Sequence, residues 1–327
     1  MKTLMIYGAT GYTGRLVAEH ALALGVPLLL AGRDAVALRE MSRALGVPHV
    51  IAAVDDVAAL DDALSDVGVL LNGAGPFFRT ASPLMEAALR HGVHYIDTSA
   101  ELVSYTHAAD LSERACAAGV MLMPGGGGSV AMLGSLAARA VQGMVAPQSI
   151  RLALRVSGPM SRGSAISALE GIGQAPMKRE NAVLVERDAT DLVDLDFGDG
   201  PVPCFPVSLP DLLTVWQATG TPNIETFVHI TGQGFPSGDL AAMPPGPSRE
   251  ERLAHRYQAV AEAVDADGQR RVARLDTVNG YTFTAMAAAE AGRRVLAGEV
   301  RPGFQTPVDV FGGGFAETIA DTTLVVG

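Results

Sequence analysis

Hydrophobic and polar positions alternate in blocks along the first 123 residues. Short apolar runs, typical of buried strands, are separated by longer segments in which apolar residues recur every three or four positions, as in amphipathic helices. The runs are residues 4–7, 27–31, 49–53, 68–71, 93–96 and 120–123. Because parallel strands need crossover helices, this order predicts an α/β domain with a doubly wound, parallel Rossmann-type sheet.

The pattern changes after Met123. Strand-like runs follow at 149–157, 182–186, 225–231 and 271–278, and helical spacing is found at 129–141, 249–264 and 281–297. Longer strands with fewer helices between them predict an α+β domain with an antiparallel or mixed sheet. The proline- and glycine-rich segment 234–248 predicts an exposed loop. We therefore expect a first domain at 1–126, a second at 127–299, and residues 300–327 packing back on the first.

Composition narrows the class of protein. The formal net charge of −11, from 24 basic and 35 acidic side chains, argues against nucleic-acid binding, which depends on neutralised phosphates. The sequence has no apolar run long enough to span a membrane and no pattern typical of a signal peptide. Two isolated cysteines make no disulfide framework, and the histidines have no metal-ligand spacing. These observations predict a cytoplasmic protein without a metal site.

A glycine motif follows the first predicted strand. Gly8, Gly11 and Gly14 lie where the chain enters the first helix, the position at which a tight turn can hold a pyrophosphate against helix N–H groups. The alternative is a glycine-rich structural turn. The spacing, with two residues between successive glycines, favours NADP. Donors to the phosphates are expected from Thr10, Tyr12 and Thr13.

The end of the second strand distinguishes between the two nicotinamide cofactors. NAD-dependent enzymes usually have an acidic residue there, which binds the ribose hydroxyls, whereas NADP-dependent enzymes have an arginine that pairs with the 2′-phosphate. This chain has Arg33 at that position, and we interpret Asp34 as the N-cap of the next helix. The sequence therefore predicts NADP(H) in preference to NAD.

The fourth and fifth strands end at the same predicted sheet edge. Small residues after the fourth strand would let the nicotinamide ribose approach the backbone, unless they form only a tight turn. Asp97 and Glu101 follow the fifth strand and would orient the nicotinamide ring or transfer a proton, while Thr98 or Ser99 capping the next helix is the alternative. The residues expected to contact the cofactor in the first of these loops are Asn72, Gly73, Ala74, Gly75 and Pro76.

The segments 8–14, 30–34, 72–77 and 94–98, together with Glu101, resemble the NADP-binding domain of the saccharopine dehydrogenase (saccharopine reductase-like) family, which includes trans-acting enoyl reductases. Segments 157–164 and 298–307 resemble the family more loosely. The chain departs from the family at 124–129, where the family often has an aromatic and an acidic residue and this chain has Pro124, four glycines and Ser129. Gly127 is therefore expected to approach the substrate.

In the second domain, three residues at a predicted helix start form a candidate anion or carbonyl site: Arg162, Gly163 and Ser164. A plain cap by Ser161 is the alternative. The strands 149–157 and 271–278 offer a sheet face through which the chain would form a homodimer.

The resemblance implies an NADPH-dependent oxidoreductase that reduces a C=N, C=C or C=O bond of a small-molecule or carrier-bound substrate. The alternative function is an NADP(H)-binding sensor or pathway partner without turnover. The usual short-chain dehydrogenase dyad is absent, since none of the six tyrosines has a lysine four residues further on.

Overall fold

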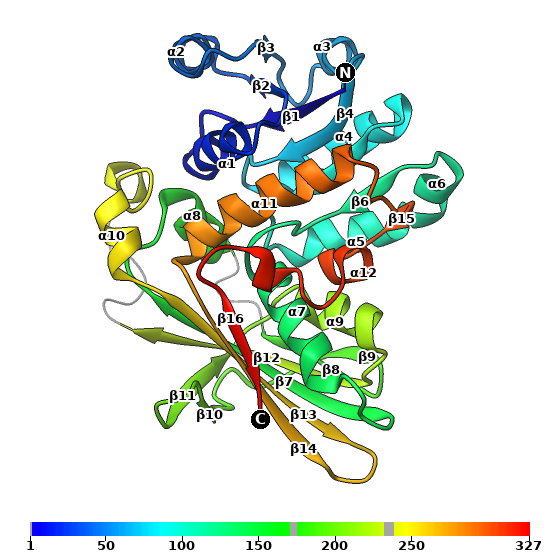
Figure 1. Ribbon diagram of the computed structural model, residues 1–327, viewed down its shortest axis with the longest axis vertical. Coiled ribbons are helices and arrows are strands. Elements are labelled where there is room, and N and C mark those ends of the chain that lie inside the picture. The colour runs from blue at the N-terminus through cyan, green and yellow to red at the C-terminus, as the bar shows by residue number, and fades with distance from the viewer. Residues whose placement is uncertain (1, 171–174, 232–238) are drawn as a thin grey trace. The chain divides into compact units, whose positions relative to one another are not determined.

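The computed structural model describes residues 2–170, 175–231 and 239–327, and the chain divides into two compact units (Figure 1). Unit 1 comprises Met1–Gly128 and Thr284–Val310, and unit 2 comprises Ser129–Phe283 and Phe311–Gly327. These boundaries differ from those expected at residues 126 and 299. Helix α11 (Gly280–Leu296) runs through both units, with only its first four residues in unit 2, and of the C-terminal residues 300–327 those from 311 onward belong to unit 2.

Unit 1 contains a seven-stranded sheet in the order β15-β6-β5-β4-β1-β2-β3. All pairs between these strands are parallel. β4 is buried at every position, as expected for a strand covered on both faces. The predicted fold class of unit 1 is therefore confirmed. The strands are β1 (Thr3–Tyr7), β2 (Leu28–Gly32), β3 (His49–Ile51), β4 (Val67–Asn72), β5 (His94–Asp97), β6 (Met121–Met123) and β15 (Gly303–Phe304).

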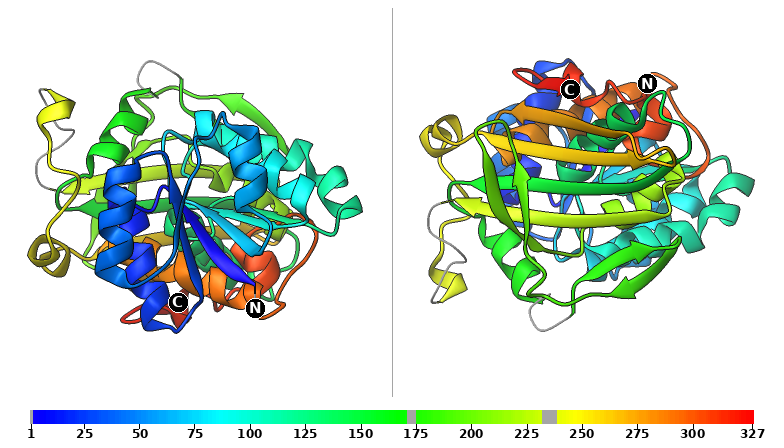
Figure 2. Two further views of the ribbon diagram at one scale, coloured as in Figure 1. Left: turned by 90° about the horizontal axis from the view of Figure 1, so that it is seen from above. Right: turned by 90° about the horizontal axis from the view of Figure 1, so that it is seen from below.

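Helices follow most of these strands and flank the sheet (Figure 2, left). They are α1 (Tyr12–Ala23), α2 (Ala35–Leu45), α3 (Val57–Ala63), α4 (Phe77–His91), α5 (Leu102–Asp110), α6 (Ser112–Ala117) and α12 (Pro307–Phe311). The strand order reverses at β1, which pairs with β2 on one side and β4 on the other. In such sheets ligands bind outside the carboxyl ends of the strands at this reversal, so the loops after β1 and β4 mark the expected site.

Unit 2 contains a nine-stranded mixed sheet, in agreement with the predicted α+β class (Figure 2, right). Its main path runs β10-β11-β12-β7-β13-β14-β16, with β8 paired to β12 and β9 paired to β8. β7 is parallel to β12 and antiparallel to β13. The strands are β7 (Pro147–Ser157), β8 (Met177–Glu180), β9 (Val183–Glu186), β10 (Val193–Asp196), β11 (Pro201–Pro206), β12 (Asn223–Thr231), β13 (Tyr257–Asp265), β14 (Arg270–Thr277) and β16 (Thr323–Val326).

The prediction of a helix at 249–264 is wrong for the second half of that segment. Helix α10 (Arg249–Ala254) ends early, and β13 then pairs with β7 on one side and β14 on the other. The alanines of this segment favour a helix in isolation, but hydrogen bonds to two strands override that preference. The predicted loop 234–248 lies partly outside the described residues. The other helices of unit 2 are α7 (Gly128–Val141), α8 (Arg162–Glu170), α9 (Asp211–Thr219), and the short 3₁₀ turns Leu240–Ala242 and Ala316–Thr318.

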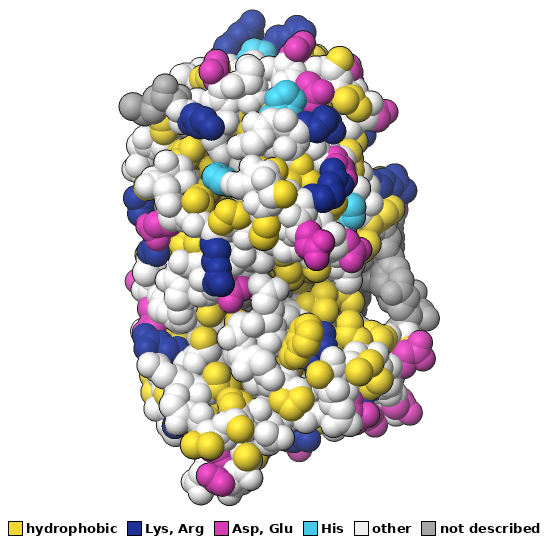
Figure 3. All heavy atoms as spheres, turned by 90° about the vertical axis from the view of Figure 1, so that its right-hand side faces the viewer, with side chains coloured by type: hydrophobic (Ala, Val, Ile, Leu, Met, Phe, Trp, Pro, Cys, Tyr) yellow, Lys and Arg dark blue, Asp and Glu magenta, His cyan; other side chains and the backbone are white. Residues whose placement is uncertain are grey.

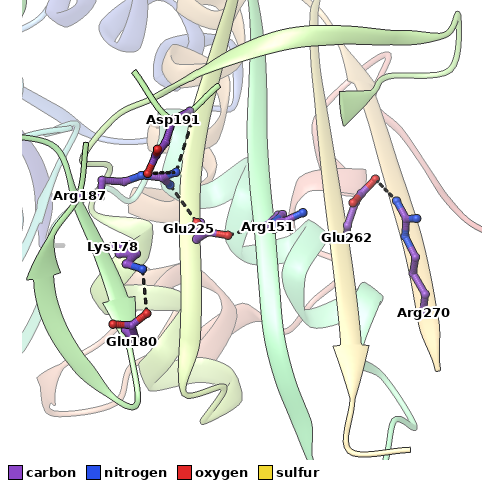
Figure 4. Close-up of polar contacts among 8 residues, drawn as sticks. All are labelled: Arg151, Lys178, Glu180, Arg187, Asp191, Glu225, Glu262 and Arg270. Atoms are coloured by element: carbon purple, nitrogen blue, oxygen red, sulfur yellow. Dashed lines mark hydrogen bonds and ion pairs between the residues drawn. The ribbon is translucent and has the colours of Figure 1, made fainter. Parts of the chain in front are cut away.

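Ion pairs link neighbouring strands of the unit 2 sheet (Figure 4). Glu225 on β12 pairs with Arg151 on β7 and with Arg187, each at 3.0 Å. Glu262 on β13 pairs with Arg270 on β14 at 2.6 Å. These charges are therefore balanced within the chain. Figure 3 shows basic and acidic side chains interspersed over one face of the molecule, without a field of one sign.

No helix in the described part of the chain is long and apolar enough to cross a membrane. Within the same residues, no three His, Cys, Asp or Glu side chains are grouped as metal ligands would be.

Candidate active site

The turn between β1 and α1 is closed by glycines. A Cβ atom at position 14 would lie 2.3 Å from the carbonyl oxygen of Gly8, a distance that excludes any side chain. Gly8 has a φ of +78°, and a Cβ there would lie 2.8 Å from the Cβ of Ala74 in the loop after β4. The structure therefore brings the two predicted glycine loops into contact at the carboxyl ends of β1 and β4.

The N-terminus of α1 lies at this turn. Its N-cap is Gly11, so no side chain in the described structure caps the helix, and its first turn contains no acidic residue. The partial positive charge of the helix end therefore faces the turn, and no acidic side chain of the helix's own first turn offsets it. Thr10 precedes the cap, and Tyr12 and Thr13 are the first two helical residues. This arrangement fits a pyrophosphate.

Arg33 lies directly after β2 and is exposed. Its neighbour Asp34 is the N-cap of α2, as predicted, because its Oδ1 accepts the N–H groups of Val36 at 3.1 Å and Ala37 at 3.0 Å. That carboxylate is thus committed to the helix, while the guanidinium of Arg33 is exposed. At this position the pair fits a cofactor with a 2′-phosphate better than one with a free ribose hydroxyl.

Asn72 organises the loop after β4. It is fully buried, its Oδ1 accepts the N–H of Ala74 at 2.9 Å, and its amide donates to Thr80 and to the Tyr95 hydroxyl, each at 3.1 Å. The N–H of Gly73 donates to the carbonyl of Tyr7 at 2.9 Å. The remaining loop residues expected at the cofactor, Gly75 and Pro76, lead into α4. The buried Asn72 side chain therefore fixes the conformation of the loop after β4 through its hydrogen bonds.

Asp97 continues this network beneath the sheet edge. It is fully buried, and its carboxylate accepts the N–H of Ser99 at 2.9 Å, the N–H of Gly125 at 2.8 Å and the hydroxyl of Tyr95 at 2.9 Å. Burial raises the pKa of Asp97 to about 6, although these three hydrogen bonds act in the opposite direction. The side chain thus ties the end of β5 to the glycine loop after β6.

Glu101 is bound to the start of α4. Its two carboxylate oxygens accept the N–H groups of Phe77 at 3.0 Å and Phe78 at 2.8 Å. Ser99 accepts the N–H of Glu101 through its hydroxyl at 3.0 Å, and Glu101 rather than Ser99 is the N-cap residue of α5. Both acidic residues therefore hold backbone segments at the sheet edge.

Gly127 packs on helix α11. A Cβ at this position would lie 2.6 Å from the carbonyl oxygen of Thr284 and 3.2 Å from the Cβ of Ala288. This close approach of the helix accounts for the glycine without a bound substrate.

The three residues predicted at a helix start in the second domain are at the N-terminus of α8. Arg162 donates through Nε to the carbonyl of Met243 at 2.9 Å, and Gly163 is exposed. The hydroxyl of Ser161 accepts the N–H of Ser164 at 3.2 Å, which confirms the cap considered as the alternative. Ser164 also bonds to a residue that the sequence analysis missed.

That residue is Tyr281, in the first turn of α11. Its hydroxyl oxygen accepts the N–H of Ser161 at 2.7 Å and lies 3.1 Å from the hydroxyl of Ser164. No sequence motif pointed to Tyr281, because it lies 117 positions from Ser164 along the chain. The only signal was its place after a glycine at the start of a predicted helix.

The fold and the sheet edge of unit 1 define a dinucleotide-binding domain of the Rossmann class. Residues 4–123 match the family model of the saccharopine dehydrogenase NADP binding domain. The match confirms the resemblance that the sequence motifs indicated for this part of the chain, and the matched domain is one that binds NADP.

Curated relatives match over the same region. A trans-acting enoyl reductase of Mycobacterium leprae is 34% identical over 123 residues, which cover 35% of this chain and 29% of the relative. A trans-acting enoyl reductase of Mycobacterium tuberculosis strain H37Rv is 31% identical over 121 residues, with the same two coverages. The match thus spans less than a third of the length of these relatives.

Solved structures share the fold over nearly the whole chain. Apo saccharopine dehydrogenase (L-Glu forming) from Saccharomyces cerevisiae has a TM-score of 0.68 at 12% identity and covers 100% of this chain and 99% of its own. GenD2 from gentamicin A biosynthesis, in complex with NAD, has a TM-score of 0.50 at 15% identity, with coverages of 99% and 96%. These likenesses show the fold.

Proposed function

We propose that the chain is an NADPH-dependent oxidoreductase that reduces a C=C, C=N or C=O bond of a small or carrier-bound metabolite. The observation that carries this proposal is the sheet edge of unit 1, where the uncapped N-terminus of α1 lies at the glycine turn and the exposed Arg33 ends β2. NADPH, when bound, supplies a hydride, and the chain has to bind and orient the reactants.

Each part of this edge has a proposed task. The turn residues Gly8, Gly11 and Gly14, with the helix N–H groups, would hold the pyrophosphate, and Arg33 would pair with the 2′-phosphate. The loop held by Asn72 would contact the nicotinamide ribose. The other residues that we expect to contact the cofactor are Thr10, Tyr12, Thr13, Gly73, Ala74, Gly75 and Pro76.

For Asp97 and Glu101, the contacts support the orienting role over direct proton transfer. Every described bond of the Asp97 carboxylate goes to the protein, and both oxygens of Glu101 accept backbone N–H groups. A carboxylate in such a setting fixes the loops against which the cofactor rests. We propose that both residues position the site.

The relatives favour the C=C bond among the three candidates. The mycobacterial proteins are named enoyl reductases, and their likeness covers the cofactor domain of this chain. An enoyl thioester on a carrier is therefore the first substrate class to test. Imines and ketones are the other two.

The test combines binding and turnover. NADPH and NADH are titrated against the purified protein by the change in nicotinamide fluorescence, and the expected preference for NADPH is at least about tenfold, the effect of one charge-assisted pair. Arg33→Ala should abolish the preference, whereas Arg43→Ala, which removes the same charge from an exposed position of α2, should keep it. Equal affinity of the unaltered protein for both cofactors would contradict the role of Arg33.

Turnover is measured as NADPH oxidation with crotonyl-CoA, a cyclic imine and a ketone. Oxidation with any of them supports the reductase. Tight NADPH binding without oxidation of any probe would instead favour the sensor or pathway partner. The homodimer and the cytoplasmic location stay predictions, and light scattering would test the first.

A further inference from the structure

The hydroxyl of Tyr95 joins the loops at the carboxyl ends of three neighbouring strands of unit 1. Tyr95 is fully buried on β5, and its hydroxyl lies between Asn72, the last residue of β4, and Asp97, the last residue of β5. The Asn72 amide donates to the phenol oxygen at 3.1 Å, and the phenol donates to Asp97 Oδ2 at 2.9 Å. Through Asp97 the connection continues to Gly125 in the loop after β6. All four residues belong to unit 1.

Chemistry fixes the direction of these hydrogen bonds. An amide nitrogen can only donate, and the Asn72 amide is oriented because its Oδ1 accepts the N–H of Ala74 at 2.9 Å. The phenol hydrogen therefore has to go to Asp97, which accepts it when ionised. A proton on Asp97 Oδ2 would point at the phenol oxygen and leave the phenol hydrogen without that acceptor. A proton on Oδ1 would face the N–H groups of Ser99 and Gly125, so the network requires the ionised form.

The buried setting of Asp97 brings its titration close to neutral pH. Burial raises the pKa of Asp97 to about 6, and the three hydrogen bonds to its carboxylate lower the pKa by less. The titratable groups that act on Asp97 are the Tyr95 phenol, on its own strand, and the Glu101 carboxylate at the start of α5, which raises the pKa further. Burial raises the pKa of Tyr95 well above its ordinary value, so the phenol stays neutral. As the pH falls through about 6, Asp97 therefore takes up a proton that the network does not accommodate.

The loop that Asn72 positions contacts the glycine turn at the same sheet edge. A Cβ at Gly8 would lie 2.8 Å from the Cβ of Ala74, the residue whose N–H the Asn72 side chain accepts. The Thr80 hydroxyl accepts from the Asn72 amide at 3.1 Å and donates to the Ala74 carbonyl at 2.6 Å. A shift of the Asn72 side chain would therefore disturb both backbone groups of Ala74, and with them the turn proposed to hold the pyrophosphate.

We propose that Tyr95 is a positioning residue for NADPH, whose hydroxyl transmits the ionisation state of Asp97 to the loop after β4, so that protonation of Asp97 weakens cofactor binding. The inference rests on the proposed function and adds regulation by pH to its cofactor site. Ionised Asp97 takes the phenol hydrogen and leaves the phenol oxygen to accept from Asn72. Protonated Asp97 competes with Asn72 for that oxygen and releases the loop. Because linked equilibria are reciprocal, bound NADPH in turn favours ionised Asp97.

The test measures the Kd of NADPH by nicotinamide fluorescence from about pH 5.5 to about pH 8, a range that brackets the titration of Asp97. In the unaltered protein we expect Kd to rise about tenfold towards the acid end, roughly the effect of one buried hydrogen bond that is not made. The 2′-phosphate of NADPH titrates in the same range in every variant, so the differences between variants carry the result.

Two variants separate the hydroxyl from the charge. Tyr95→Phe keeps the ring, and because the Tyr95 hydroxyl lowers the pKa of Asp97, its loss should move the fall in affinity to higher pH. At pH 7 its Kd should be about tenfold above that of the unaltered protein. Asp97→Asn cannot ionise, and its amide would donate to the phenol oxygen as a protonated carboxyl does. This variant should bind NADPH weakly at every pH, with only the pH dependence of the phosphate.

Tyr105→Phe is the matched control, because Tyr105 is equally buried and its hydroxyl donates to the carbonyl of Ser99 at 2.6 Å. It should keep the pH dependence of the unaltered protein. A Tyr95→Phe profile equal to that of Tyr105→Phe would overturn the inference, since it indicates only the loss of a buried hydroxyl. So would an unaltered protein that loses no more affinity in acid than Asp97→Asn does, a test that needs no Tyr95 variant to fold. If the unaltered protein binds no NADPH at any pH, the proposed function fails and this inference with it, a result distinct from both.

Discussion

Asp211, the first residue of α9 in unit 2, has a buried carboxyl group that no other described residue stabilises by a hydrogen bond. It is fully buried, and within the described residues neither carboxylate oxygen has a hydrogen-bond partner in another residue. Burial raises its pKa from 3.8 to about 7, and its own backbone N–H lowers the pKa by less. The ionised form of this side chain therefore lowers the free energy of unfolding, because burial removes the water that solvates its charge.

The sign and size of this cost follow from linkage. Between the two pKa values, 3.8 unfolded and about 7 folded, the unfolded chain binds fewer protons, so stability falls as the pH rises through this range. A difference of about three pKa units corresponds to an upper limit of about 4 kcal/mol. The variant Asp211→Asn keeps the shape and removes the charge. We expect it to unfold with a free energy larger by a few kcal/mol at pH 8, roughly within that limit, and with little gain at pH 4.

The assay is urea unfolding followed by tryptophan fluorescence. The chain has a single tryptophan, Trp216, on the same helix as Asp211, and its ring lies 4.2 Å from the Arg179 guanidinium, so the signal reports on this part of unit 2. Asp188→Asn is the control with the opposite sign, because hydrogen bonds from Thr190 lower the pKa of that exposed aspartate. If Asp211→Asn is no more stable than the unaltered protein at pH 8, or gains equally at all pH values, the carboxylate has a partner and the reasoning fails.

Two further predictions concern the ion pairs and the glycine turn. Glu225→Gln removes the 3.0 Å ion pair of the Arg187 side chain, which is 4% exposed, and leaves the 3.6 Å contact to the exposed Asp191 carboxylate as its described ion pair, beside a 3.4 Å bond to the Asp191 carbonyl. It should lower the free energy of unfolding by about 2 kcal/mol. Glu180→Gln, whose side chain is 50% exposed, should change it by less than about 0.5 kcal/mol in the same urea titration. Equal effects would contradict the weight given to burial. Gly14→Ala, with its Cβ 2.3 Å from the Gly8 oxygen, should weaken NADPH binding at least tenfold, roughly 1.4 kcal/mol, and an unchanged dissociation constant would exclude this turn from the cofactor site.

Much of unit 1 could be predicted because its signals are local. Six strands came from apolar runs that lie within one or two residues of the observed bounds, and Asp34 was recognised as a cap from its position before a helical pattern. Turn glycines and caps depend on the nearest few residues, so they can be read without a partner strand.

Unit 2 could be predicted only in part because its sheet depends on distant pairing. The alanine-rich segment of β13 has high helix propensity. It forms a strand because it hydrogen-bonds to β7 on one side and to β14 on the other. The strands β8, β10 and β11 and the helix α9 were not predicted at all. They are short, and β11 contains prolines at 201, 203 and 206.

The sequence by itself determined the parallel sheet, the glycine turn and Arg33, because periodicity and short motifs encode them within a few neighbouring residues. Only the tertiary structure decided which polar groups meet. In the folded chain, Asp97 accepts a hydrogen bond from Gly125 and Glu101 accepts one at the start of α4. The Tyr281 hydroxyl forms hydrogen bonds with Ser161 and Ser164. Contacts of this kind join residues up to 120 positions apart, and no local pattern specifies a hydrogen bond across such a separation.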